Sequence, residues 1–210
     1  MKFAVLSKHL LICNALLLAA CSGGTGGDNA ASSSSSAQSI PASGYTIGGA
    51  VAGLASGATV VLHNNGATVN VTANGAFTFT DPVANSNPYS VTVMTQPASP
   101  AQTCTVTKGW GTANTNVTDV SVTCATESHR VSGTVTGLKG SLVAQNNGSD
   151  DLTVSANGAF IFPIPVASGA AYTVTLLSQQ DSAGHKCSVS NGSGVIGGAD
   201  ATNVVITCTP

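Results

Sequence analysis

The sequence predicts an all-β protein made of two tandem antiparallel β-sandwiches of about seven strands each. Thr and Val, both β-branched, supply 25 and 23 of the 210 residues, and charged residues supply only 7%, which favours pleated sheet over helix. One stretch of about 80 residues also occurs twice. Because the whole chain has only six Lys and Arg residues, it cannot neutralise a run of phosphates, and no nucleic-acid partner is expected.

Residues 1–20 form a predicted lipoprotein signal peptide. A short basic start is followed by an apolar run of about eleven residues, which is too short to cross a bilayer. The run ends in Leu18-Ala19-Ala20-Cys21, which resembles the lipobox of bacterial lipoprotein signals. The resemblance implies cleavage before Cys21, a lipid on its thiol and acylation of the new N-terminus, so the lipid bilayer is the first expected partner. The alternative is an ordinary secretory signal with a chance cysteine.

Residues 21–44 comprise the predicted lipidated Cys21 and a flexible tether. The tether is rich in Ser and Gly and offers no side chains that could fill a core. A flexible coil of about 23 residues has a root-mean-square reach of roughly 26 Å, which holds a folded body clear of lipid head groups. Ser22 rather than Asp follows the cysteine, and among lipoproteins of enteric bacteria this favours the outer membrane.

The rest of the chain is a tandem duplication that comprises residues 45–126 and 129–210. Matching motifs recur at offsets of 82 to 84 residues, which is too constant for a shared composition alone. They are Ile47–Leu54 with Val131–Leu138, Asn64–Gly66 with Asn146–Gly148, Ala73–Phe77 with Ala156–Phe160, and Tyr89 with Tyr172. Two copies indicate a pair of domains rather than a solenoid, so each copy is expected to fold around its own core.

Within each copy, apolar and polar residues alternate with the period of half-buried strands. Asn74-Gly75 and Asn157-Gly158 lie between such runs, and because Asn-Gly suits a type I′ turn, we predict a hairpin at each. The seven strands predicted in the first copy lie near residues 45–51, 58–63, 67–73, 76–80, 89–95, 102–108 and 116–124.

Each copy shows, in order, Gly-x-Val-x-Gly, Asn-Gly-x-Phe and an alternating strand that begins with Tyr. In the second copy these residues are Gly133, Val135, Gly137, Asn157, Gly158, Phe160, Tyr172, Val174 and Leu176. The order resembles the carboxypeptidase regulatory-like domains, which are transthyretin-like or immunoglobulin-like sandwiches. The resemblance implies a spacer, adhesive or accessory module of the bacterial envelope, and it brings no catalytic residue. The last part of each copy departs from the family by adding a cysteine pair.

Of the six cysteines, Cys13 lies in the predicted signal and Cys21 in the lipobox. The other four are Cys104, Cys124, Cys187 and Cys208. Four cysteines allow three pairings, and because each copy should fold alone, we predict the disulfides Cys104–Cys124 and Cys187–Cys208. In a hairpin, the first bond would place Val106 opposite Val122 on the inward face. A metal site would need Cys-x-x-Cys or nearby histidines, so neither a metal nor a cofactor is expected.

The sequence contains no recurring catalytic constellation. His63, His129 and His185 have no histidine counterpart in the other copy, and neither a nucleophile elbow nor His-Glu-x-x-His occurs. Gly192–Gly197 matches the letters of a dinucleotide-binding loop, but a strand rather than a helix is predicted after it. The oxygen-rich segment Asn146–Asp151 is interpreted as a solvated turn, with a calcium site as the alternative. We therefore expect no enzymatic activity.

Trp110, the only tryptophan, and Lys108 lie between the cysteine-bearing strands of the first copy. The counterpart of Trp110 in the second copy is Ser193, so the duplicated fold does not require an indole at this position. The ring either covers the end of the domain or contacts a ligand.

The sequence predicts a non-catalytic envelope lipoprotein that acts as a structural spacer or an adhesion module, with an envelope protein or a polysaccharide as partner. The alternative is a carbohydrate- or peptide-binding module that uses the loop around Trp110.

Overall fold

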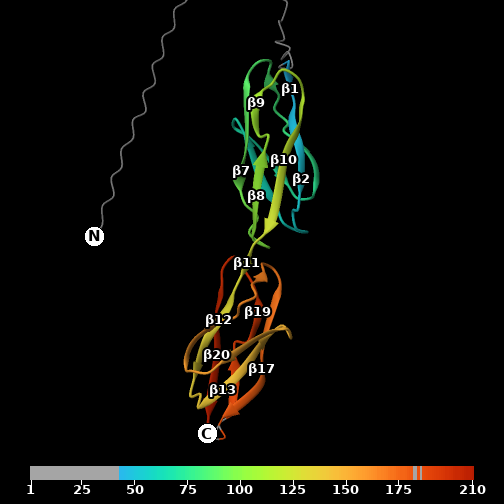
Figure 1. Cartoon of the computed structure of the whole chain (residues 1–210). Helices are drawn as coiled ribbons and strands as arrows, with labels where there is room; N and C mark the ends of the chain where they lie inside the picture. The colour runs from blue at the N-terminus through green and yellow to red at the C-terminus, as the bar shows by residue number, and fades with distance from the viewer. Residues whose placement is uncertain (1–42, 182–183, 185) are drawn as a thin grey trace, which may run out of the picture. The chain divides into compact units, whose positions relative to one another are not determined.

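The computed structural model describes residues 43–181, 184 and 186–210, and these form two β-sandwiches without a helix among them (Figure 1). The predicted all-β class with two tandem sandwiches is confirmed. The predicted signal peptide, Cys21 and nearly all of the tether lie outside the described residues. The described residues contain no helix with the length and apolar character that a membrane span requires.

The first sandwich contains the first ten strands. They are β1 (Gly44–Tyr45), β2 (Ile47–Ala52), β3 (Val60–Asn64), β4 (Ala67–Val71), β5 (Gly75–Thr78), β6 (Val83–Ala84), β7 (Pro88–Thr95), β8 (Gln102–Thr107), β9 (Trp110–Thr112) and β10 (Val117–Thr126). Two four-stranded sheets have the orders β5-β2-β10-β8 and β4-β3-β7-β9, and β1 pairs with β6.

The second sandwich repeats this topology. Its strands are β11 (Ser128–His129), β12 (Val131–Thr136), β13 (Gly140–Asn146), β14 (Asp150–Val154), β15 (Gly158–Ile161), β16 (Val166–Ala167), β17 (Ala171–Asp181), β18 (Lys186–Ser190), β19 (Ser193–Val195) and β20 (Ala201–Thr209). The sheets have the orders β15-β12-β20-β18 and β14-β13-β17-β19, and β11 pairs with β16. The strand order is thus the same in both copies.

Each sandwich has its own apolar core. Inward-facing residues of the two sheets meet there. Phe79, directly after β5, is 1% exposed, and Phe162, directly after β15, is 0% exposed. A second Phe packs edge-on against each of these rings, with centroids 6.0 Å apart for Phe77–Phe79 and 5.7 Å apart for Phe160–Phe162. The duplicated apolar pattern therefore builds two separate cores.

The hairpins predicted at Asn74-Gly75 and Asn157-Gly158 are wrong. Strands β4 and β5 belong to different sheets, so Asn74-Gly75 lies in a connection between sheets. The reason is the Asn74 side chain, which accepts a hydrogen bond from the Leu54 amide and donates one to the Leu54 carbonyl, both at 2.8 Å. The tight hairpin is at Asn65-Gly66, where φ is 47° and 101° and Asn64 pairs with Ala67 across β3 and β4.

The prediction of wholly antiparallel sheets is wrong for one pair in each sandwich. β2 runs parallel to β10, and β12 runs parallel to β20, so the first long strand of each copy pairs with its last. Glycine makes this approach possible. A Cβ atom at Gly49 would lie 1.8 Å from the carbonyl oxygen of Val120, and one at Gly133 would lie 1.9 Å from that of Val204. This contact explains the first glycine of the Gly-x-Val-x-Gly motif.

We predict that Gly133→Ala lowers the free energy of unfolding of the second sandwich by about 3 kcal/mol or more, because the added methyl group would collide with a backbone oxygen of the paired strand. Gly197→Ala is the matched control, since a Cβ there meets nothing within 4 Å, and we expect it to change stability by less than about 0.5 kcal/mol. Denaturant unfolding followed by circular dichroism measures both. An unchanged curve for Gly133→Ala would contradict the close approach of β12 and β20.

Candidate functional site

The structure joins Cys104 to Cys124 and Cys187 to Cys208, with S–S distances of 2.02 and 2.00 Å. Each pair occupies directly opposite positions of an antiparallel ladder, between β8 and β10 or between β18 and β20. In the first copy, Val106 accordingly lies opposite Val122. Each disulfide fastens an edge strand to the strand that ends its copy.

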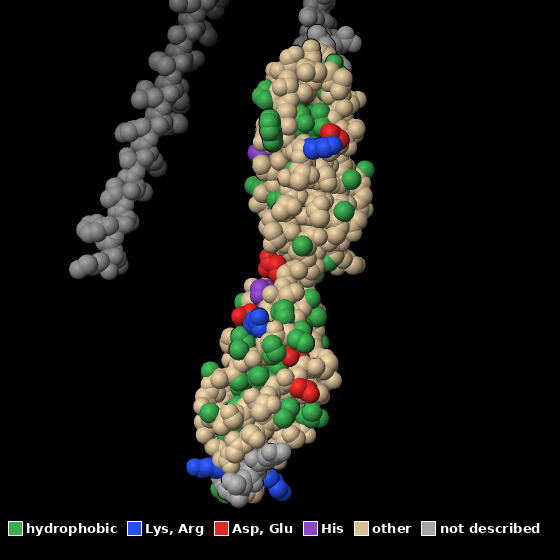
Figure 2. Space-filling model, viewed as in Figure 1, with side chains coloured by type: hydrophobic (Ala, Val, Ile, Leu, Met, Phe, Trp, Pro, Cys, Tyr) green, Lys and Arg blue, Asp and Glu red, His purple; other side chains and the backbone are tan. Residues whose placement is uncertain are grey.

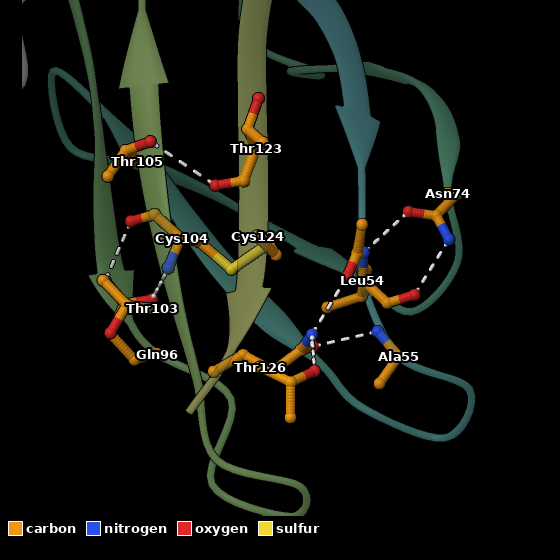
Figure 3. The surroundings of a disulfide bond; sticks show 12 residues. Leu54, Ala55, Asn74, Gln96, Thr103, Cys104, Thr105, Thr123, Cys124 and Thr126 are labelled. Atoms are coloured by element: carbon orange, nitrogen blue, oxygen red, sulfur yellow. Dashed lines mark hydrogen bonds between the residues drawn. A yellow bond between two sulfur atoms is a disulfide. The ribbon is translucent and has the colours of Figure 1, made fainter. Parts of the chain in front are cut away.

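Side-chain amides surround the first disulfide (Figure 3). Gln96 follows β7, and its amide accepts a hydrogen bond from the Cys104 N–H (2.8 Å) and donates one to the Cys104 carbonyl (3.0 Å). Gln179 makes the same pair of bonds to Cys187, at 2.9 and 3.3 Å. Because β7 and β8 belong to different sheets, Gln96 links the two sheets beside the sulfur bridge. No signal in the sequence marks these glutamines, because they lie in polar segments that resemble ordinary surface.

Gln102 is a second amide near this disulfide, and it is 1% exposed. Its oxygen accepts a hydrogen bond from the Ala55 N–H (2.9 Å), and its nitrogen donates to the Gly53 carbonyl (2.9 Å) and to the Thr126 hydroxyl (3.0 Å). These bonds satisfy backbone groups after β2, which a buried loop would otherwise leave unpaired. Gln102 therefore has a structural role, and its sequence counterpart His185 lies outside the described residues.

Trp110 begins β9 and is 82% exposed, so it does not cover the end of the sandwich. Its strand pairs with β7, where Trp110 lies opposite Ser90 and Gly111 opposite Tyr89. A Cβ at Gly111 would lie 2.9 Å from the buried Tyr89 ring. Gly111 therefore faces inward, and by alternation Trp110 faces outward from the sheet.

Lys108, the other predicted contact residue, lies in the turn before β9 with a φ of 55°. Its ammonium group is 3.3 Å from the Asp119 carboxylate, and both side chains are exposed, at 66% and 61%. An exposed pair of this kind contributes little to stability, but it neutralises the lysine charge. Lys108 is thus near Trp110 in sequence but is already paired with an anion.

The described histidines do not form a catalytic constellation. The Nε2 of His63 accepts a hydrogen bond from the Gly66 N–H at 3.0 Å, which closes the β3–β4 hairpin. His129 is 3.7 Å from carboxylate oxygens of both Glu127 and Asp200. Among the residues that the structure describes, no three His, Cys, Asp or Glu side chains are grouped as a metal site would require.

The interpretation of Asn146–Asp151 as a solvated turn holds for only part of the segment. Asp151 is exposed and accepts a hydrogen bond from the Gln145 amide at 2.6 Å. Asp150, however, is only 5% exposed, and its carboxylate accepts a hydrogen bond from the Ile164 N–H at 3.1 Å. Asp150 is therefore buried and holds the segment that follows β15. Its register partner Asn146 is also buried, at 2% exposure.

A groove of about 730 Å³ runs beside the edge strands β14 and β15. A smaller groove of about 270 Å³ lies at the equivalent place in the first sandwich. Asn157 and Asn74 line the two grooves, but their amides are engaged with the backbones of Leu138 and Leu54. Neither groove is lined by a charged side chain.

The Gly192–Gly197 segment contains β19 and is followed by β20, without the helix that a dinucleotide site needs.

No protein-family model matches the chain, and no curated protein matches it. Among solved structures, it is similar to the major pilin protein T-13 of Streptococcus pyogenes, with a TM-score of 0.29 and 13% identity over 79% of this chain and 97% of the pilin. It is also similar to two B repeat units of the collagen-binding protein of Staphylococcus aureus, with a TM-score of 0.29 and 16% identity over 79% of this chain and 49% of that structure. Neither similarity assigns a function to this protein.

We predict that the double variant Cys187→Ala/Cys208→Ala lowers the free energy of unfolding of the second sandwich by about 3 kcal/mol, the loop-closure value for a bridge of this span. Cys104→Ala/Cys124→Ala is the matched variant and should have the same effect on the first sandwich alone. Hydrogen exchange followed by mass spectrometry at rising denaturant resolves the two, because peptides from residues 45–126 and 129–210 are measured separately. Loss of both transitions in either variant would show that the copies do not fold separately.

Proposed function

We propose that the protein is a non-catalytic lipoprotein of the bacterial outer membrane, anchored through acylated Cys21. Its two sandwiches act as a structural spacer or as an adhesion module. The observation that carries the proposal is the sequence Leu18-Ala19-Ala20-Cys21, followed directly by the Ser- and Gly-rich tether that leads to β1. A lipid anchor, a flexible spacer and a folded body in this order are what such a module needs.

The folded part supports a role in an oxidising compartment outside the cytoplasm. Each sandwich carries one disulfide, and such bonds persist in the periplasm and on cell surfaces. Charged side chains are sparse on the visible face of the described part (Figure 2). Both sheets of each sandwich end in strands that are paired on one side only, and such strands offer backbone groups to a partner. An envelope protein or a polysaccharide is the partner class that we propose.

A second candidate function is carbohydrate or peptide binding at the loop around Trp110. The observation that favours it is the 82% exposure of the ring. The fold does not require the Trp110 ring to be so exposed. An exposed aromatic ring is a common centre of a binding site. The second copy carries Ser193 at this position, which supports a role for the ring in contact rather than in the fold.

We predict that mass spectrometry of the membrane-purified protein finds an N-terminal peptide that starts at Cys21 and carries a diacylglycerol and an acyl chain. Cys21→Ser should remove the lipid and move the chain from the membrane fraction to the soluble fraction, because a protein without acyl chains has no anchor. Cys13→Ser is the matched control and should leave both the lipid and the location unchanged. An unmodified Cys21 in the mature protein would contradict the proposal.

A further inference from the structure

We propose that the outer face of the sheet β4-β3-β7-β9 binds a neutral polysaccharide chain, with Trp110 as the surface on which a sugar ring stacks. The inference deepens the second candidate function and rests on it, and it is independent of the lipid anchor. We define the Trp110 face as the outward side chains of Thr68, His63, Ser90, Thr92 and Trp110.

The backbone holds the indole in an outward position. Val91 donates a hydrogen bond to the Gly109 carbonyl at 2.5 Å, directly before β9 begins. The ladder from β9 to β7 then continues to Thr112, and the inward Gly111 lies against the Tyr89 ring. The indole N–H has no hydrogen-bond partner among the described residues and is free to donate to a ligand. The ring is thus presented by a strand of the sheet rather than by a loop.

Polar groups continue from the ring across the sheet. Ser90 is directly opposite Trp110, Thr92 is the next outward residue of β7, and His63 lies opposite Thr92. Thr68 follows on β4, opposite His63. From strand spacing and rise, Trp110 and His63 are about 12 Å apart. This row therefore offers hydroxyl and imidazole groups over a length suited to more than one sugar unit.

His63 contributes a donor to this row. Its Nε2 already accepts the Gly66 N–H bond, so in the neutral imidazole the proton resides on Nδ1, which can donate to a ligand. The hydroxyls of Ser90 and Thr92 can each donate and accept. Neither hydroxyl has a hydrogen-bond partner within the described part of the chain. The Nδ1–H of His63 and the hydroxyls of Ser90 and Thr92 are therefore available to a ligand.

The chemistry of the Trp110 face fits a neutral sugar chain better than an anion or a protein. Lys108, the only Lys or Arg between residues 43 and 126, is paired with Asp119. No other charged side chain belongs to the face, so an anionic polymer has no counter-charge. A protein partner held by apolar contacts would need a broad apolar patch, whereas Ser90, opposite Trp110, and Thr92 on the same strand carry hydroxyls. A pyranose presents C–H groups on one face and hydroxyls at its rim, which matches an indole bordered by hydroxyl and imidazole groups.

The second sandwich supplies a comparison within the same molecule. At the positions of Trp110, His63 and Thr68 it carries Ser193, Gln145 and Asp151. There the Gln145 amide is bonded to the Asp151 carboxylate at 2.6 Å, so its donor is occupied and a negative charge is added. The proposal therefore confines binding to the first sandwich, with one site per chain.

The test uses the full chain in detergent micelles and an array of neutral gluco-, galacto- and manno-oligosaccharides. We expect at least one to bind with a stoichiometry of one and to shift the emission of the only tryptophan to shorter wavelength. Trp110→Ala should weaken binding by about tenfold or more, as for a central aromatic contact, and His63→Ala should weaken it less. Val195→Ala removes an apolar side chain that is 67% exposed on the equivalent strand of the second sandwich, and it should leave binding unchanged.

Unchanged melting temperatures of the Trp110→Ala and Val195→Ala variants would verify that both fold. Binding that survives Trp110→Ala, or that leaves the emission spectrum unmoved, would overturn the proposal. The absence of binding to every neutral oligosaccharide would overturn it too, and so would binding only to extended peptides. Lipid analysis of the same preparation tests the anchor separately, so failure of the sugar site and failure of the lipoprotein proposal are distinguishable.

Discussion

The parallel pairing of the first long strand with the last one is the contact on which each sandwich depends. In the first copy, β2 lies between β5 and β10, and β10 lies between β2 and β8. These two interior strands connect the beginning of the copy to its end, so the sheet β5-β2-β10-β8 cannot form from half of a copy. The glycine at position 49, or at 133 in the second copy, permits the backbones to approach. The disulfide then fastens the last strand to the edge strand beside it.

This arrangement accounts for the use of polar side chains in a chain with few charges. Asn74 and Gln102 bond to backbone groups where the chain passes from β2 to β3. Gln96, directly after β7, bonds to the backbone of Cys104 in β8 of the other sheet. Amides can satisfy both a donor and an acceptor of the backbone, which a hydroxyl or a carboxylate does less completely. The surface that remains is rich in Thr, Ser and Asn and has few charged groups. On such a surface, an indole that is 82% exposed is a feature that the fold itself does not need.

Most of the fold could be predicted from the sequence, because the alternation of apolar and polar residues and the duplication are strong signals. The seven longer strands of the first copy appear close to their predicted ranges. The pairing of Cys104 with Cys124 could be predicted because each repeat should fold on its own with its own two cysteines. Short strands such as β6 and β9 were missed because two or three residues show no period. The place of the β3–β4 hairpin was missed because two Asn-Gly pairs compete for it, and only the structure shows that Asn74 is engaged with Leu54. Parallel pairing leaves no local mark at all, since it joins residues about 70 positions apart.

Native-state hydrogen exchange is the most direct measurement of the central claim. The account predicts that the slowest amides of the first sandwich lie in β2 and β10, and those of the second in β12 and β20, because these are the interior strands that must separate for a copy to open. The two sandwiches should also exchange as separate units. Amides of β2 and β10 that exchange as fast as those of the two-residue pair β1–β6 would contradict the account.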